Sequence, residues 1–485
     1  MRTWPRAPLA PVAAGVLLLA AACTGGPPPP GGPESPRPLP TAFAGDPPPG
    51  LSSDPLRYLH GPGAGGPAIL DDAMGVRIQS VGDAFLISSN SEERHLLQDA
   101  ADGTTLWEGD RPIDRFGTDG GGADVLVVGS GDDDGDTTVV DAEGATLWSG
   151  TGGRDVYVGG AVLRRPEGWT ADDPYGDLAL LDTEGDPLWD FAFAAPPDAG
   201  EGAEAPSPSP PPAGDASDPD PGRMGVPVAA RDGVALLDDG AGLLQARDIG
   251  GDPGELLWSA TGDDPDLAGE AALPRPLPRV VGFYDVPAPG DGGTGGTPSA
   301  RGTPSPDGPG AAPARTAVLV RWAFAEDPSL LSLHDLRGGE VLWTLTEPGA
   351  NPAGPAFDPG FVPGTVHDPA TGTLLLPQAG GATPMIAVDL AAGRVRWEFD
   401  ADEQAISPAF ALGGRFYGDS RGADDAASSQ VVLDAETKDV VAEGLDAYVE
   451  AVTDDGHAVV VADRQRFVFA PEDAPATGGP ATPTG

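Results

Sequence analysis

The sequence predicts an all-β protein, a β-propeller of four-stranded blades, with eight blades favoured and seven as the alternative. One unit recurs along the chain: an apolar strand, an aspartate, a glycine-containing turn and a tryptophan. The tryptophans of its first three copies, Trp107, Trp148 and Trp189, are 41 residues apart. A repeat of about 40 residues with turn signals between short apolar runs is typical of such blades. The chain shows no sustained helical period.

Seven copies of this repeat follow one another. The aspartate and tryptophan of each copy are Asp99 and Trp107, Asp141 and Trp148, Asp182 and Trp189, Asp248 and Trp258, Asp335 and Trp343, and Asp389 and Trp397; the seventh begins at Asp434 and has Ala442 in the tryptophan position. After it, three more apolar runs occupy 449–452, 458–462 and 467–470. They favour an eighth blade, closed by N-terminal strand residues near Ala68–Leu70, because pairing the two ends of the chain removes free sheet edges.

Both repeated residues have a structural explanation. An aspartate at a strand end can accept hydrogen bonds from turn amides, and a glycine that follows can adopt a positive φ. A tryptophan at a fixed place in each blade can fill the wedge between neighbours while its N–H reaches a backbone carbonyl. We therefore expect structural roles rather than ligand stacking. Trp169 and Trp322 lie outside the pattern and are expected to be core or loop anchors.

Glycine and proline mark the interruptions of the repeat. The step between tryptophans rises to 69 before Trp258 and to 85 before Trp343. Those two excesses coincide with Pro/Gly-rich segments at 195–222 and 286–315, which we expect to be disordered insertions. The same composition predicts a disordered tail at 471–485. The propeller itself is expected over 51–470.

The repeat resembles the PQQ-like β-propeller repeat, whose pattern is approximately Ala-Leu-Asp-Ala-x-Thr-Gly-x-x-Leu-Trp. The segments 434–437 and 389–397 are close local matches, and the resemblance covers roughly 75–470. For quinone dehydrogenases of this family the resemblance implies adjacent cysteines and a calcium ion at the cofactor. This chain has one cysteine, so we expect no cofactor and no such enzyme activity.

The N-terminus predicts an extracytoplasmic address. Two arginines and an apolar run precede Leu19-Ala20-Ala21-Ala22-Cys23, which resembles the bacterial lipobox, although Ala20 stands where a large aliphatic residue is usual. The resemblance implies a signal peptide over 1–22 and a lipid on Cys23, followed by a Pro/Gly-rich tether to residue 50. The alternative is an ordinary cleaved signal with an incidental cysteine. We expect a monomer, lipid-anchored on the outer face of the cell membrane.

Composition and net charge limit the classes of partner that this chain can bind. With 27 basic and 75 acidic residues the formal charge is −48, which excludes binding driven by nucleic-acid phosphates. It also excludes electrostatic docking to an anionic membrane, so the lipid would be the only membrane contact. An envelope protein or a small polar or cationic ligand is the expected partner. The single lysine among these basic residues is typical of a GC-rich genome and indicates an actinobacterium.

Candidate catalytic and metal-binding residues are few. The loop with Asp132, Asp134 and Asp136 resembles a calcium loop but has Thr137 where the EF-hand needs glycine. We interpret it as a solvated acidic loop and expect no metal. The five histidines are scattered, and we expect them on the surface or in turns. The chain is therefore predicted to be a binding scaffold of the cell envelope. A sensor ectodomain partnered with a membrane kinase or transporter, and an envelope enzyme with rim-loop catalytic residues, remain the alternatives.

Overall fold

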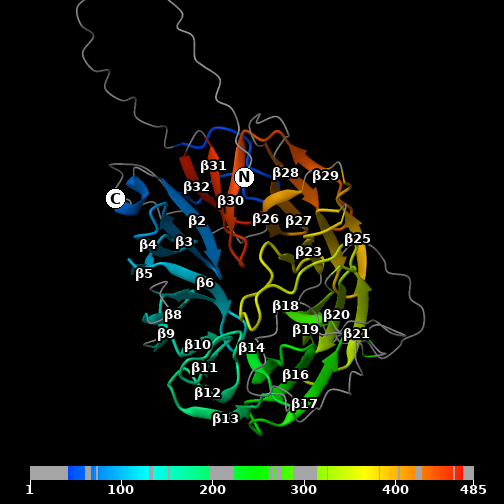
Figure 1. The fold of residues 1–485 in the computed structure, drawn as a ribbon. Coiled ribbons are helices and arrows are strands. Elements are labelled where there is room, and N and C mark those ends of the chain that lie inside the picture. The colour runs from blue at the N-terminus through cyan, green and yellow to red at the C-terminus, as the bar shows by residue number, and fades with distance from the viewer. Residues whose placement is uncertain are drawn as a thin grey trace, which may run out of the picture. The chain divides into compact units, whose positions relative to one another are not determined.

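The computed structural model is an eight-bladed β-propeller (Figure 1). Eight antiparallel sheets of four strands each are arranged in a ring, which confirms the predicted fold and decides for eight blades. The residues that the structure describes are 42–59, 67–72, 75–129, 135–150, 153–195, 223–262, 264, 267, 276–287, 314–324, 326–381, 383–401, 403, 405–420, 429–462 and 465–472. The signal peptide, the lipobox and Cys23 lie outside them.

Each blade takes its four strands in chain order from the centre of the ring outward, except the last. Blade 1 contains β2 (Val76–Val81), β3 (Ala84–Ser89), β4 (His95–Asp99) and β5 (Thr105–Gly109); blade 2, β6 (Ile113–Thr118), β7 (Asp124–Val128), β8 (Thr137–Asp141) and β9 (Thr146–Gly150); blade 3, β10 (Asp155–Val158), β11 (Ala161–Arg164), β12 (Gly176–Leu181) and β13 (Pro187–Phe193); blade 4, β14 (Val226–Arg231), β15 (Val234–Asp238), β16 (Leu243–Asp248) and β17 (Leu256–Thr261); blade 5, β18 (Leu277–Pro287), β19 (Ala314–Ala323), β20 (Leu330–Asp335) and β21 (Val341–Thr346); blade 6, β22 (Val366–Asp368), β23 (Thr373–Pro377), β24 (Met385–Asp389) and β25 (Arg394–Glu398); blade 7, β26 (Ile406–Leu412), β27 (Arg415–Ser420), β28 (Ser429–Asp434) and β29 (Val440–Glu443); blade 8, β30 (Ala447–Val452), β31 (Ala458–Ala462), β32 (Gln465–Phe469) and β1 (Arg57–Tyr58).

The core lies between neighbouring blades. Leu86 and Leu97 of blade 1 pack with Leu126 and Val140 of blade 2 in one buried cluster. The middle strands therefore have apolar neighbours on both faces, and β3 and β15 are buried along their whole length. This two-sided burial explains why these strands read in the sequence as continuous apolar runs rather than as an alternation.

The repeated aspartates organise the turn between the third and fourth strand of a blade. In each of the seven copies the carboxylate accepts a hydrogen bond from a turn amide. The bonds run from Asp102 N to Asp99 (2.8 Å), Ala145 N to Asp141 (2.7 Å), Asp186 N to Asp182 (2.8 Å), Gly250 N to Asp248 (3.0 Å), Gly338 N to Asp335 (2.6 Å), Ala392 N to Asp389 (3.1 Å) and Thr437 N to Asp434 (2.9 Å).

Three of the repeated tryptophans fasten one blade to the next. Their indole Nε1 atoms donate to the carbonyl that follows the repeat aspartate of the next blade, a contact that we call the blade staple. It joins Trp258 to Leu336 (2.8 Å), Trp343 to Leu390 (2.7 Å) and Trp397 to Ala435 (2.9 Å). The glycine of the receiving turn lies against the indole ring. A Cβ on Gly393, which has φ +61°, would stand 2.2 Å from Trp343 Cγ, so this position requires glycine for space as well as conformation.

Arg57 makes the staple where the ring closes. Its Nε donates to the carbonyl of Ala100 (3.3 Å), the residue after the repeat Asp99, and its Nη2 donates to the carbonyl of Asp99 (3.0 Å). The closing strand is thus β1 and not the predicted Ala68–Leu70. That segment forms a single 3-10 turn, η1 (Ala68–Asp71), behind Pro67, because Ile69 and Leu70 bury their side chains in the cluster of blade 1.

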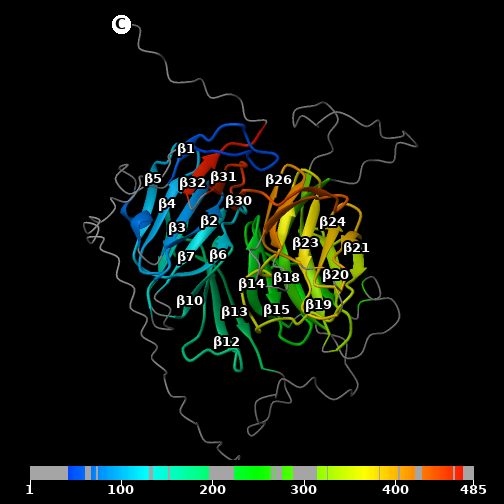
Figure 2. The same ribbon diagram turned by 90° about the horizontal axis from the view of Figure 1, so that it is seen from above.

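The missing tryptophan at Ala442 has a topological reason. Blade 8 takes its fourth strand from the other end of the chain, so it has no third-to-fourth turn that could accept an indole N–H. Instead Phe43 packs edge-on against Phe467 and Phe469, with ring centroids 5.4 and 5.0 Å apart. Figure 2 shows this N-terminal segment (blue) beside β32 (red). From residue 42 on, the segment predicted as tether is therefore packed chain.

The boundaries of the second insertion and of the tail also shift. Val286 and Pro287 belong to β18, and Ala314 and Arg315 belong to β19, so strand pairing reaches inside the predicted insertion 286–315. Pro471 of the predicted tail forms a bridge with Leu51. The residues 196–222, 288–313 and 473–485 lie outside the described part of the chain.

Arg57→Gln should weaken the closure of the ring. The variant loses charge-assisted hydrogen bonds to two carbonyls, which we expect to lower the free energy of unfolding by about 2 kcal/mol. Amide hydrogen exchange should rise first in β1 and β32. The control is Arg94→Gln, which removes an exposed ion pair with Asp72 and should leave exchange there unchanged. Equal effects of both variants would contradict the staple at Arg57.

Candidate functional site

The two faces of the propeller differ in their connections. Antiparallel pairing places the turns between the first and second and between the third and fourth strands on one face, which we call the turn face. The connections between the second and third strands and between consecutive blades lie on the other, the loop face. Apart from 288–313, no connection on the turn face is longer than 249–255. Long connections on the loop face include 165–175, 194–225, 262–276 and 347–365.

Short turns join each other across the turn face. Asp454 N donates to the carbonyl of Gly82 (3.0 Å), and Gly82 N donates to the carboxylate of Asp124 (3.1 Å), which links blades 8, 1 and 2. Asp232 N donates to the carbonyl of Gly120 (2.8 Å). These bonds pair turn amides and carbonyls with groups of other blades, so these turns hold the ring together.

One connection of the loop face crosses the central channel. Residues 352–362, which we call the strap, leave blade 5 after β21 and run in the middle of the ring (yellow in Figure 1) before β22 begins. Pro359 and Phe361 of the strap line a cavity together with residues of the inner strands β6, β10 and β14. The strap therefore extends from blade 5 to the walls of blades 2, 3 and 4.

Phe357 anchors the strap. It has a left-handed backbone (φ +57°), which is rare for an aromatic residue and costs free energy. Its buried ring compensates by lying against the turn of blade 4, where a Cβ on Gly240 would stand 2.8 Å from Phe357 Cζ. The ring of Trp169 meets it edge-on at 6.2 Å, so Trp169 is an anchor of the loop face.

Asp358 ties the strap to the channel wall. Its Oδ2 accepts a hydrogen bond from Arg279 Nη2 of the inner strand β18 (2.8 Å), and the same nitrogen donates to the carbonyl of Gly360 (2.6 Å). The Arg279 side chain is 11% exposed and that of Asp358 is 34% exposed. The ion pair is thus partly shielded from solvent, where charge attraction is stronger than on the surface.

The base of the strap is held by a buried polar network. Arg321 makes two parallel hydrogen bonds to Glu347, each 2.7 Å long. Ser329 donates to Glu347 (2.6 Å), Gln378 donates to its other oxygen (2.8 Å), and Asn351 donates to Ser329 (2.9 Å). Buried charges that are paired and hydrogen-bonded in this way fix one geometry. This rigid base sets the direction in which the strap leaves blade 5.

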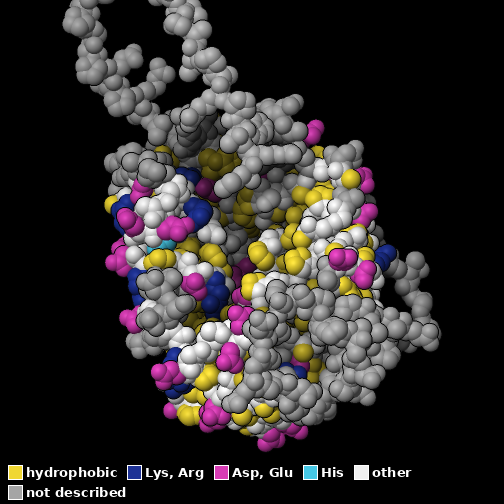
Figure 3. Space-filling model, in the orientation of Figure 1, with side chains coloured by type: hydrophobic (Ala, Val, Ile, Leu, Met, Phe, Trp, Pro, Cys, Tyr) yellow, Lys and Arg dark blue, Asp and Glu magenta, His cyan; other side chains and the backbone are white. Residues whose placement is uncertain are grey.

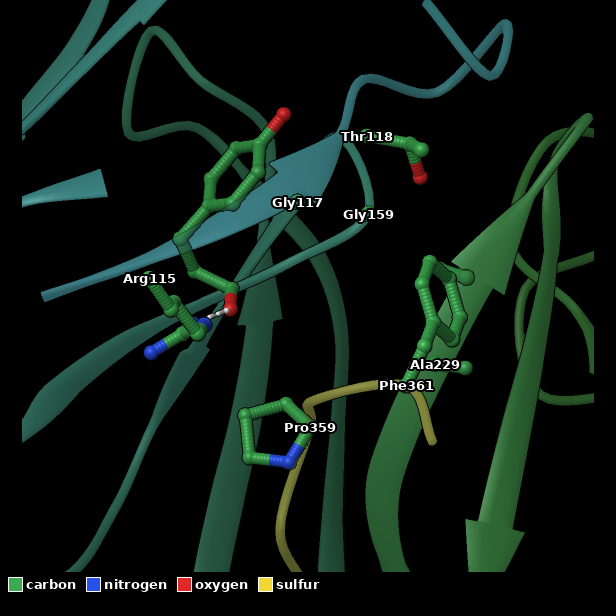
Figure 4. Close-up of a pocket in the computed structure, with 9 residues that line it drawn as sticks. Arg115, Gly117, Thr118, Gly159, Ala229, Pro359 and Phe361 are labelled. Carbon is green, nitrogen blue, oxygen red and sulfur yellow. Dashed lines mark hydrogen bonds between the residues drawn. The ribbon is translucent and has the colours of Figure 1, made fainter. Parts of the chain in front are cut away.

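A small cavity of about 20 Å³ lies beside the strap (Figure 4). Pro359 and Phe361 form one side of it, and Arg115 projects from β6 on another. Arg115 Nη2 donates to the carbonyl of Tyr157 (2.6 Å). Burial lowers the pKa of Arg115, while the carboxylates of Asp114 and Asp358 oppose this shift. Arg115 thus lines the cavity beside the strap and is itself paired with Asp114 (3.3 Å). Figure 3 shows the loop face hollowed at the centre of the ring.

Two of the histidines predicted to lie on the surface or in turns are buried in strands, so that expectation was wrong for His95 and His334. Each contacts a serine: Ser88 Oγ lies 2.9 Å from His95 Nδ1, and Ser332 Oγ lies 2.7 Å from His334 Nε2. Burial lowers the pKa of His334 to about 4. The exposed fraction of Ser88 is 2% and that of Ser332 is 0%, so we assign both pairs to the core. Trp322, also fully buried, donates to the same Ser332 (2.7 Å).

The remaining predicted site residues are placed as follows. Asp132 and Asp134 lie outside the described residues, whereas Asp136 is exposed and its carbonyl accepts from Arg111 (3.1 Å). Within the described ranges, no group of three His, Cys, Asp or Glu side chains is arranged to hold a metal ion. No helix in that part of the chain is long and apolar enough to cross a membrane.

The comparisons with known proteins do not assign the chain to a family. No protein-family model matches the sequence, and no curated protein matches it. Similar solved structures include BamB from Moraxella catarrhalis (14% identity, TM-score 0.39, covering 81% of this chain and 96% of that chain), the quinohemoprotein alcohol dehydrogenase ADHIIG from Pseudomonas putida HK5 (14%, 0.39, 82% and 75%) and Sqt1 from Saccharomyces cerevisiae (10%, 0.40, 82% and 97%). At these scores they carry no argument about function.

The strap was not found from the sequence, although a signal existed. The step from Trp343 to Trp397 is 54 residues rather than 41, and the excess falls in 347–365. That segment lacks the composition of the two large insertions, and nothing in it shows that Asp358 would meet Arg279. The repeat also marks His334 as buried, because it precedes Asp335 at a position where Val140 precedes Asp141 and Val388 precedes Asp389.

Asp238→Asn should change the pH dependence of stability. Asp238 ends β15 beside the turn that receives Phe357, and its Oδ1 accepts from Gly240 N (2.8 Å). Burial, with the nearby Asp239 carboxylate, raises the pKa of Asp238 to about 7. Ionisation is therefore easier in the unfolded chain, and this group's contribution to stability is lost as pH rises from about 4 to 7. An asparagine keeps the acceptor and does not titrate.

Relative to wild type, the free energy of unfolding of Asp238→Asn should rise by on the order of 3 kcal/mol over that range. Denaturant unfolding at several pH values measures this difference. A difference that stays constant with pH would contradict the raised pKa.

Proposed function

We propose that this protein is a binding scaffold of the bacterial cell envelope that receives a protein partner on its loop face and is held at the membrane by lipid on Cys23. The observation that carries the proposal is the asymmetry of the ring. Apart from 288–313, the connections of the turn face are short and several of them bind one another, whereas the other long connections and the strap lie on the loop face. Rigid scaffolds commonly present variable loops in this way, and binding residues concentrate on such loops.

The position of the N-terminal segment supports the assignment of the loop face as the binding face. Ser52 N donates to the carbonyl of Ala470 (2.9 Å), and Glu472 N donates to that of Gly50 (2.9 Å). These residues lie past the end of β32, at the turn-face end of blade 8. The N-terminal end of the described chain therefore lies at the turn-face end of blade 8, away from the loop face.

Charge favours a basic or polar partner. The formal charge of −48 creates a field that attracts cations and repels acidic surfaces. Association with a basic partner should be faster at low ionic strength and should weaken as salt screens the attraction.

Cys23→Ala should release the protein from the membrane. Without a thiol no thioether lipid can form, so the variant should move from the membrane fraction to the soluble extracytoplasmic fraction. Mass spectrometry of the wild-type N-terminal peptide should show the added mass of the acyl chains. An unmodified Cys23 in membrane-bound wild type would refute the anchor.

A photo-crosslinking amino acid should capture the partner only from the loop face. Suitable exposed positions are Glu93 and Asp327 on the loop face and Glu143 and Glu184 on the turn face. In intact cells we expect a discrete crosslinked product, visible on an immunoblot, from the first pair and none from the second. Products from the turn-face pair alone, or from neither pair, would overturn the proposed binding face.

A further inference from the structure

We propose that Arg279 forms a carboxylate-binding site in the wall of the central channel, and that Asp358 of the strap occupies this site until a carboxylate of the partner replaces it. The site rests on the proposed function only in assigning the carboxylate to a partner. Its chemistry is argued from Arg279 and the strap alone.

The contact between Arg279 and Asp358 runs through one nitrogen of the guanidinium. Arg279 binds both Asp358 and the carbonyl of Gly360 through Nη2. A guanidinium offers five donors in a planar fork, and a carboxylate is held best by two parallel N–H bonds. The pair Arg321 and Glu347 in the same blade has that two-bond geometry. Asp358 is thus a weaker occupant than a freely placed carboxylate would be.

The contacts that hold the strap in place are partly offset by unfavourable features of the same residues. Its anchor, Phe357, combines a buried ring with a left-handed backbone, so packing must offset backbone strain. Its carboxylate reaches the channel arginine from a side chain that is one-third exposed. A ligand entering from the loop face can therefore reach Asp358 first and compete with it at Arg279.

The surrounding charge explains how an acidic protein could take a carboxylate. The whole chain repels anions, but Arg279 places a guanidinium in the channel wall, where its side chain is 11% exposed and its ion pair is with Asp358. A partner with a basic surface and one projecting carboxylate can make both interactions. Its basic surface is attracted to the acidic ring, and its carboxylate enters the channel and binds Arg279. That carboxylate is either the C-terminus of a chain or an acidic side chain.

Asp358→Asn should open the site to small carboxylates. Isothermal titration calorimetry on the full-length protein in detergent would use three probes: N-acetylglycine as a C-terminus, N-acetylglutamic acid α-amide as an acidic side chain, and N-acetylglycinamide as the neutral control. At least one carboxylate should bind Asp358→Asn about tenfold more tightly than wild type, and the probe that binds identifies the source. The neutral amide should bind neither. Binding should disappear when Arg279→Gln is added.

Asp155→Asn is the matched control, because it frees Arg164 from a two-bond ion pair on the surface. This variant should bind the probes no better than wild type. Equal binding of carboxylates by Asp358→Asn and wild type, equal binding of the neutral amide, or binding that survives Arg279→Gln would each overturn the proposal. None of these readouts needs the lipid or the partner, so they fail independently of the crosslinking test.

A measurement on wild type avoids any effect of the variants on folding. Saturating carboxylate probe should raise amide hydrogen exchange of the strap, because Asp358 is displaced, while N-acetylglycinamide should not. Unchanged exchange at 352–362 under both probes would contradict the displacement.

Discussion

The packing of each blade against its neighbours is the constraint on which the ring depends, and the blade staple fixes that packing from blade 4 to blade 7. A single four-stranded blade cannot bury both of its faces, so each needs a neighbour at a fixed distance and angle. The indole of one blade sets that geometry because it fills the wedge and donates to the carbonyl just after the next blade's aspartate, as Trp258, Trp343 and Trp397 do. The aspartate positions that carbonyl by accepting hydrogen bonds from the amides of its own turn, and the turn glycine leaves room for the indole.

The two junctions of blade 8 follow from the same rule. Between blades 7 and 8 the receiving turn does not exist, and the sequence there has Ala442 instead of tryptophan. Between blades 8 and 1 the receiving turn exists, but the donor comes from the N-terminal strand, and Arg57 reaches the equivalent carbonyl of Ala100. Phe43 fills part of the wedge that the missing indole leaves. The closure of the ring is therefore made by side chains from both ends of the chain.

The junctions of blade 8 also show which features of the fold could be predicted from the sequence. The aspartate–tryptophan spacing repeats with the blades, so the fold followed from it, whereas the eighth blade was favoured over seven by the apolar runs after the seventh copy. Arg57 could not be found that way, because its role depends on a pairing between residues about 400 positions apart. The strap could not be found either. Its step of 54 residues indicates extra chain, but the contacts of Phe357 and Asp358 with other blades are set by the curvature of the ring.

We propose different tasks for the two faces: the short turns hold the ring together, and the long connections of the loop face receive a partner. Amide hydrogen exchange on the protein in its native envelope, compared with the purified protein, tests this assignment most directly. We expect protection at 165–175, 239–242 and 352–362 in the envelope, with no change at 142–145, 336–340 and 390–393. Protection of the turn face, or identical exchange in both preparations, would contradict it.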